Sequence, residues 1–418
     1  MGDRDPAFRD GTADAARAAE EAARAAYGRL VAYLAARSRS VATAEDALGD
    51  ALVAALETWP RAGVPEKPEA WLLAVARRRL IDRGRHARVE AAAAPTLQMA
   101  VDGAAREAEA ATAFPDERLK LLFVCAHPAL DASMRTPLML QAVLGLDAAR
   151  IASAFLVAPA TMSQRLVRVK AKIRAAGIRF EIPEPRELPT RLDAVAEAIY
   201  GAYGSGWEDV AGADPRRKGL AGEALSLGRL LARLVPDEPE VHGLLALMLY
   251  CEARRGARRD AGGGYVPLSR QDVGRWSVPM IEEAERVLGA AARLGRPGRF
   301  QLEAAIQSVH AQRAVTGRTE WEAIALLYEG LMRIAPTIGA QVGQAAALGE
   351  ARGAEAGLAA LGAIPDDAVR SYQPYWALRA HLLKRLSRVE EAGPAYARAI
   401  GLSEDRAVRD FLAREQLT

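Results

Sequence analysis

The sequence predicts an all-α protein. Half of its 418 residues are hydrophobic, many of them alanine, and only 6% are aromatic, a composition that favours closely packed helices over sheets. Apolar residues recur at helical steps of three and four in many stretches of the chain. A prior of about 150 residues per domain suggests roughly three domains.

The N-terminal part of the chain predicts two amphipathic helices. Residues 14–39 are alanine-rich, with Tyr27, Leu30 and Leu34 on one face. In the next segment we expect Thr43 to be the N-cap, with Glu45 and Asp46 in the first turn. This second helix is expected to end at Pro60 and to bury one stripe of residues: Leu48, Leu52, Val53 and Leu56.

A third helix is predicted over residues 69–90. Its first half is apolar and contains Trp71, whereas its second half is strongly cationic. We therefore expect the first half of this helix to pack in a hydrophobic core and the second half to be exposed and basic. The charged residues of its second half are Arg77, Arg78, Arg79, Arg83, Arg85 and Arg88, opposed by Asp82 and Glu90.

Residues 146–173 predict two short crossed helices joined by a tight turn at Ala158-Pro159, because proline suits the first turn of a helix. The second helix buries Met162, Leu166, Val169 and Ile173. Its other side is polar and basic, which suits a recognition helix that contacts base edges and phosphates. A plain helical hairpin is the alternative. The polar side consists of Thr161, Ser163, Gln164, Arg165, Arg168, Lys170, Lys172 and Arg174.

The order of these features resembles bacterial RNA polymerase sigma factors of the extracytoplasmic-function type. The resemblance covers residues 18–180 and includes the sequence AWLLAVARRRLID at 70–82. The phrase CAHPALD at 125–131 is similar to the subgroup with a long C-terminal helical extension. We therefore expect a sigma region 2 module at 14–90, a linker at 91–113, a region 4 helix-turn-helix module at 114–180, a junction at 181–210 and a helical extension at 211–418.

The resemblance implies an alternative sigma factor that directs RNA polymerase core to promoter DNA. The polymerase-binding residues would be Ala44, Glu45, Asp46 and Asp50. Trp71 and Ile81 would belong to the helix that melts the −10 element. DNA binding would fall to Arg77, Arg78, Asp82, Arg83, Arg85, Arg88, Thr161, Ser163, Gln164, Arg165, Arg168 and Lys172.

The C-terminal half predicts paired helices. Residues 375–405 resemble a tetratricopeptide repeat, through Leu378, Leu382, Leu386, Ala392, Tyr396, Ala399 and Ile400. Stacked repeats form a solenoid that suits a regulatory protein partner. Residues 260–276 contain three consecutive glycines without a phosphate-binding motif, and we expect them to be a flexible linker.

The sequence gives little support for a metalloprotein, a membrane protein or an enzyme. Cys125 and Cys251 lie far apart in apolar runs, so we expect no metal site and no cofactor. No apolar run would span a bilayer, and we expect a cytoplasmic protein that is not an enzyme. A rival hypothesis is a sigma-derived protein that has lost polymerase binding and uses its extension to bind or transform a small molecule. Departures from the sigma pattern at Gly49-Asp50 and at 203–207 motivate it.

Overall fold

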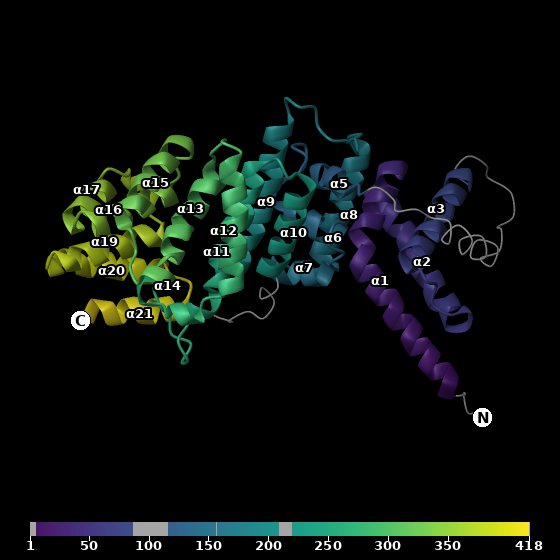
Figure 1. Cartoon of the computed structure of the whole chain (residues 1–418), viewed down its shortest axis with the longest axis horizontal. Coiled ribbons are helices and arrows are strands. Elements are labelled where there is room, and N and C mark those ends of the chain that lie inside the picture. The colour runs from purple at the N-terminus through teal and green to yellow at the C-terminus, as the bar shows by residue number, and fades with distance from the viewer. Residues whose placement is uncertain (1–5, 87–115, 156, 209–219, 418) are drawn as a thin grey trace. The chain divides into compact units, whose positions relative to one another are not determined.

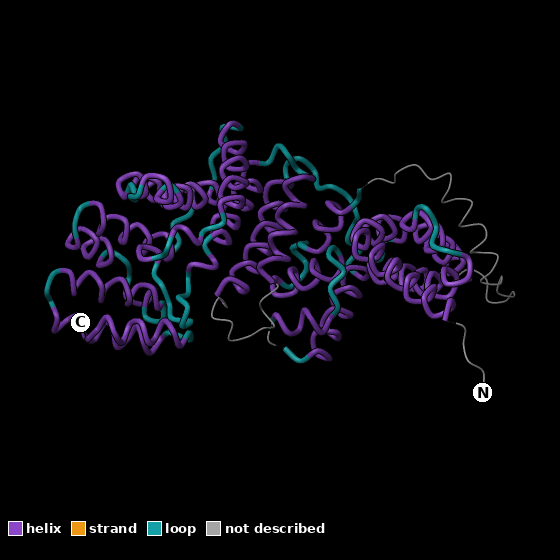
Figure 2. Tube along the Cα trace, turned by 60° about the horizontal axis from the view of Figure 1, so that its bottom comes forward, coloured by secondary structure: helices purple, strands orange, loops and turns teal. Residues whose placement is uncertain are grey.

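A computed structural model describes residues 6–86, 116–155, 157–208 and 220–417 of the chain. Every regular element in these ranges is a helix, apart from an isolated bridge between Arg259 and Tyr265 (Figure 2). The predicted all-α class is confirmed. The chain divides into two compact units, Met1–Ala202 and Tyr203–Thr418, and the two modules that resemble sigma regions both lie in the first unit. The predicted linker at 91–113 lies outside the described residues.

The first unit opens with three helices, α1 (Pro6–Ser38), α2 (Val41–Ala62) and α3 (Pro68–His86), which pack on one another (Figure 1). Their core contains the fully buried Leu30 and Leu34 of α1 and an edge-to-face pair of Trp59 with Trp71, whose ring centroids are 5.4 Å apart. Large buried aromatic side chains fix the crossing of α2 over α3.

Both ends of α2 differ from the prediction. The N-cap is Ser40, whose hydroxyl accepts a hydrogen bond from the backbone N–H of Thr43 at 3.2 Å. Pro60 lies inside the last turn, and the helix ends two residues later before Gly63, whose φ is +84°. Pro60 lacks the N–H that would donate to the Leu56 carbonyl, so it removes one helical hydrogen bond, and the helix continues for only two residues beyond it.

The second part of the first unit comprises α5 (Arg118–Cys125), α6 (Ala132–Ala142), α7 (Ala148–Ala154), α8 (Pro159–Ala175) and α9 (Leu188–Glu208). The core of this part includes Phe123 and Leu138, both fully buried. Two long-range hydrogen bonds attach α9: the Thr136 hydroxyl donates to the carbonyl of Ala198 at 2.7 Å, and Arg191 donates to the carbonyl of Phe123 at 2.7 Å. The helix includes Gly201, Gly204 and Gly206 and ends at Glu208, six residues into the second unit.

The second unit consists of successive helices that pack mainly on their neighbours in sequence. Figure 1 shows them in green to yellow. The helices are α10 (Leu220–Leu234), α11 (Pro239–Ala253), α12 (Val278–Arg293), α13 (Arg299–Ala311), α14 (Arg313–Thr316), α15 (Trp321–Ile334), α16 (Ile338–Ala351), α17 (Ala354–Gly362), α18 (Asp366–Val369), α19 (Gln373–Arg385), α20 (Val389–Leu402) and α21 (Arg406–Leu417). In the predicted repeat, Leu382, Ala392, Tyr396 and Ala399 are buried, while Leu378, Leu386 and Ile400 are packed at the edge of the same clusters.

The expectation of a flexible linker at 260–276 is wrong. Residues 254–276, here called the strap, are folded, with three short 3-10 turns, η2 (Arg255–Ala257), η3 (Leu268–Arg270) and η4 (Val273–Arg275). The Asp260 carboxylate accepts the N–H groups of Gly262 at 2.9 Å and Gly264 at 2.7 Å. These side-chain hydrogen bonds form an Asx-type turn, which satisfies backbone N–H groups that lie outside any helix. The glycines therefore form a tight bend and not a flexible linker.

The strap is attached to the last helix of the chain. Arg270 forms an ion pair with Glu415 at 2.8 Å, and the rings of Tyr265 and Phe411 meet edge to face at 5.4 Å. Arg259 forms a further ion pair with Asp405, just before α21. Contacts about 145 residues apart in sequence therefore join the start and the end of the second unit.

Candidate nucleic-acid and polymerase interface

The outward side of α8 is polar and basic. Met162, Leu166, Val169 and Ile173 are buried, as the spacing predicts. The first turn begins with Pro159, and no side chain caps it. The backbone N–H groups of this turn therefore receive no side-chain acceptor from the N-cap residue. The polar residues exposed on this side, here called the α8 surface, are Ser163, Gln164, Arg165, Arg168, Lys172 and Arg174. Thr161 is half-buried at the edge of this surface.

Lys170 leaves the α8 surface and turns toward α2. Its ammonium group donates to Glu45 Oε2 at 2.5 Å and to Gln141 Oε1 at 2.9 Å. The Lys170 and Glu45 side chains are only 10% and 14% exposed. Burial raises the pKa of the Glu45 carboxyl, and the charge and hydrogen bond of Lys170 act in the opposite direction. Glu45, predicted to bind polymerase, and Lys170 of α8 are thus brought together.

The other predicted polymerase-binding residues lie on different sides of α2. Ala44 is fully buried in the helical core, whereas Asp46 is exposed and Asp50 is half-buried. Val53 and Leu56, predicted to be buried, are instead 55% and 48% exposed. The correction follows from helical spacing, because positions 46, 50, 53 and 57 share one face. We define the outer face of α2 as Asp46, Gly49, Asp50, Val53, Leu56 and Glu57.

The predicted basic half of the third helix is described only in part. Arg77 is exposed, and Arg78, Arg79 and Asp82 are half-buried. Ile81 is 53% exposed. The helix continues to His86, so Arg83 and Arg85 lie on helical backbone, but their side chains, and Arg88 as a whole, are outside the described residues. Trp71 is buried against Trp59 and supports the helix from within the core.

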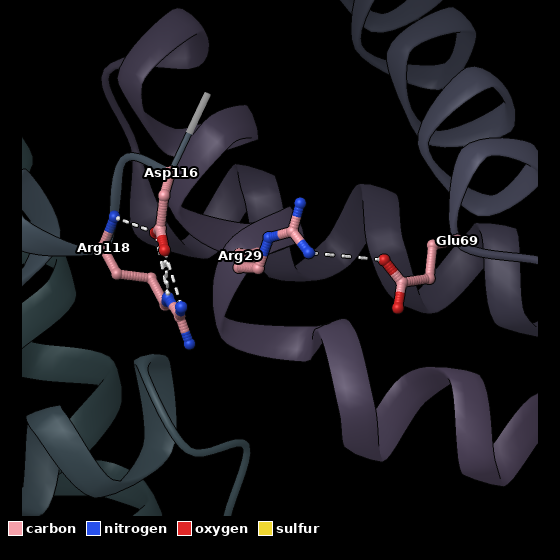
Figure 3. Close-up of polar contacts among 4 residues, drawn as sticks. All are labelled: Arg29, Glu69, Asp116 and Arg118. Atoms are coloured by element: carbon pink, nitrogen blue, oxygen red, sulfur yellow. Dashed lines mark hydrogen bonds and ion pairs between the residues drawn. The ribbon is translucent and has the colours of Figure 1, made fainter. Parts of the chain in front are cut away.

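Two ion pairs flank the place where α1 meets the start of α5. Figure 3 shows Arg29 of α1 directed toward Glu69 of α3, with 3.7 Å between Nη1 and Oε2, and Arg118 holding Asp116 at 2.6 Å. Partial burial alone would raise the pKa of Asp116, but hydrogen bonds from Arg118 and the charge of Arg29 bring it below its usual value. The positive charge of Arg29 on α1 therefore acts on Asp116, just before α5.

The described ranges show neither a metal site nor a membrane helix. No group of three or more His, Cys, Asp or Glu side chains within them is arranged to hold a metal ion. None of the described helices is long and apolar enough to cross a bilayer. Burial raises the pKa of both the Cys125 and the Cys251 thiol.

Comparison with known families agrees with the three-helix geometry. Residues 23–89, which cover the C-terminal half of α1 and all of α2 and α3, match the sigma-70 region 2 family. The chain therefore contains a sigma-70 region 2 domain, and this match supports a sigma-factor-like role in transcription initiation.

A second match and one relative extend the comparison. Residues 191–292, which include the strap, match a family of unknown function, DUF6596. The chain is 41% identical over 405 residues to an uncharacterized protein of Rhizobium meliloti (strain 1021), covering 94% of each chain, and it belongs to the same family as that protein. No solved structure matches.

Proposed function

We propose that the protein is an alternative sigma factor of the extracytoplasmic-function type, which directs RNA polymerase core to specific promoters in the cytoplasm. The observation that carries the proposal is the sigma-70 region 2 match over a three-helix group whose middle helix keeps two large apolar side chains, Val53 and Leu56, exposed beside acids. Exposed apolar side chains beside charged groups are typical of protein interfaces.

Two DNA-reading surfaces follow from this proposal. The exposed Arg77 and its neighbours on α3 would contact the −10 element. The α8 surface would enter the major groove at −35, with Gln164 and Arg165 one turn from the uncapped helix start, where base edges are within reach. Lys172, further along, would contact phosphate.

Run-off transcription with core polymerase tests the proposal. Full-length protein should redirect core to a subset of promoters. Val53→Ser together with Leu56→Ser should weaken core binding at least tenfold, because fully burying an apolar side chain contributes about 1.5–3 kcal/mol and each of these two has only about half of its surface left to bury. The matched control is Val315→Ser, a residue of α14 in the second unit that is 90% exposed. Unchanged core binding by the double variant, or no redirected transcription, would reject the proposal.

For the second unit we propose a tetratricopeptide-like repeat that assists polymerase assembly or binds a regulatory protein. Support comes from the packing of successive helices and from the buried repeat positions of α19 and α20. Truncation after Gly201 should lower transcription at matched concentrations across several promoters. Equal activity of the full-length and truncated proteins would remove this role and favour the small-molecule hypothesis.

A further inference from the structure

The turn between α5 and α6 belongs to the CAHPALD sequence and takes no part in the proposed DNA-reading surfaces. His127 lies in this turn and is half-buried. Its Nδ1 atom accepts a hydrogen bond from the backbone N–H of Ala129 at 3.1 Å. The proton of the neutral ring is therefore on Nε2. That N–H is a donor, and no acceptor for it lies within the described residues.

Two arginines from different helices are attached to the two ends of this turn. Arg191 of α9 donates to the carbonyl of Phe123, near the end of α5, at 2.7 Å. Arg135 of α6 donates to the carbonyl of Leu130 at 3.4 Å. Both arginines are half-buried, and His127 lies between the two carbonyls in the sequence. Three elements thus contribute to one group of side chains, here called the turn cluster: His127, Arg135 and Arg191.

The two guanidinium groups of the turn cluster have neutral partners only. In the part of the chain that the structure describes, neither Arg135 nor Arg191 forms an ion pair, and the Nε atom of each is buried without a hydrogen-bond partner. The acids that act on them are exposed. Asp131 caps α6 by accepting the N–H of Ser133 at 2.9 Å, and Glu187 lies one turn before Arg191. Two positive charges are therefore left without a bound counter-charge.

The members of the turn cluster disfavour one another's charged forms. Burial and the charges of Arg191 and Arg135 lower the pKa of His127, while Glu187 acts in the opposite direction. Burial also lowers the pKa of Arg191, and there the charge of Glu187 opposes that of Arg135. Such mutual effects require the three side chains to lie close together. An anion bound among them would stabilise all three charged or donor groups at once.

We propose that the turn cluster binds a small phosphoryl dianion, either inorganic phosphate or a phosphomonoester. A ligand that offers only acceptors suits a group of N–H donors, and a phosphoryl group carries a charge of about −1.5 to −2 at pH 7, which matches two guanidinium groups. Donors from three elements also suit a tetrahedral anion better than a planar carboxylate. Since Arg135 comes from α6 and Arg191 from α9, the bound anion would hold α9 to the turn. The site is independent of the proposed sigma function.

Equilibrium dialysis of the full chain against radiolabelled inorganic phosphate, at constant ionic strength, tests the site. One phosphate should bind to each chain. Arg135→Gln and Arg191→Gln should each weaken binding about tenfold, because each removes a charge-assisted hydrogen bond. The matched control is Arg179→Gln with Arg186→Gln, which removes the same charge from exposed positions of the same unit and should change the affinity less than about twofold.

Milder variants separate loss of the site from loss of the fold, since Arg191 also attaches α9. Arg191→Lys keeps the charge but loses the planar pair of donors, and it should weaken binding less than Arg191→Gln does. His127→Phe keeps a ring and removes the donor, and it should weaken binding several-fold. All variants should keep their helical circular dichroism. Full phosphate affinity in a folded Arg135→Gln, Arg191→Gln protein overturns the proposal, as does an equal loss in the control pair.

Competing ligands establish the chemical class. Glycerol phosphate, a phosphomonoester, should displace labelled phosphate at similar concentrations, whereas the monoanions dimethyl phosphate and acetate should need at least about ten times more. Equal displacement by dimethyl phosphate would assign the turn cluster to the phosphodiester backbone of a nucleic acid, and equal displacement by acetate would assign it to a carboxylate. Either result overturns the phosphoryl dianion. Absence of saturable binding by both phosphate and glycerol phosphate overturns the site itself.

Discussion

Arg259 and Asp405 lie 146 residues apart in sequence and form an ion pair that ties the strap to the start of α21. The Arg259 side chain is 13% exposed, and its Nε and Nη1 atoms are buried with no hydrogen-bond partner. Burial tends to raise the pKa of Asp405, but the hydrogen bond and charge of Arg259 lower it overall. The arginine therefore depends on this one carboxylate for its side-chain hydrogen bond.

Asp405→Ala should destabilise the second unit by about 2 kcal/mol, because it leaves a mostly buried guanidinium without its acceptor. Urea unfolding measures the loss. The matched control is Asp410→Ala, which breaks the exposed pair with Arg406 and should cost well under 1 kcal/mol. Equal losses from the two variants would show that the strap contributes little to stability.

Gly49→Ala should stabilise the first unit by about 0.5–1 kcal/mol. Gly49 lies in the middle of α2 and is exposed, and an added Cβ would meet nothing within 4 Å. Alanine then restricts the unfolded chain without a clash in the folded one. Thermal unfolding of the two proteins gives the difference, and a lower melting temperature for the alanine variant would contradict it.

The stability of the second unit should fall as the pH drops from about 6.5 toward 4, partly because of His310. Burial and the charges of Arg254 and Arg313 lower the pKa of His310 from 6.5 to about 4. In that pH window the unfolded chain binds a proton that the folded chain excludes, so folding loses up to about 3 kcal/mol, at about 1.4 per pH unit.

His310→Gln removes this contribution. The free energy of unfolding, measured in urea from pH 7 to pH 4, should fall less steeply in the variant than in the unmodified protein. His310 also meets the Trp321 ring edge to face at 5.3 Å, so the variant will lose some stability at all pH values. The slope is the informative quantity, and parallel curves would show that His310 titrates normally.

On the α8 surface, Arg165→Ala should relax the preference at one or two −35 base pairs by about 1–3 kcal/mol each. Lys172→Ala should weaken all sequences about equally and reduce the salt dependence of binding. Arg186→Ala, outside α8 and exposed, is the control for loss of a cation. Binding of holoenzyme to a library of −35 variants measures all three. Unchanged base preferences for Arg165→Ala would make that residue a phosphate or structural contact.

Periodicity predicted the helices and the buried side of α8 well, because Met162, Leu166, Val169 and Ile173 depend only on the helical repeat. The same rule failed for α2. Alanines at Ala44, Ala47, Ala51, Ala54 and Ala55 fill the core instead of the larger Val53 and Leu56. Hydrophobicity alone ranks leucine and valine above alanine, so the choice of face was wrong where close helix packing selects small residues.

Contacts between residues far apart in the sequence could not be predicted from local sequence patterns. Nothing near Lys170 in the sequence indicates that it pairs with Glu45, which is 125 residues away, while the cations on either side of it, Arg168 and Lys172, face solvent. The strap has the glycines of a linker, and its order comes from the Asp260 turn and from contacts with α21. Asp260, and Asp272 whose carboxylate accepts the N–H of Gly274 at 2.9 Å, are the local signals that this segment is folded.

The second oxygen of Glu45 limits how firmly α2 and α8 are held together. Oε1 is buried and has no hydrogen-bond partner, while Oε2 receives Lys170. An unsatisfied buried acceptor costs about 1–3 kcal/mol, which offsets part of what the ion pair contributes. A hydrogen-bond donor placed beside Oε1 would therefore hold α8 against α2 more firmly than the present geometry does.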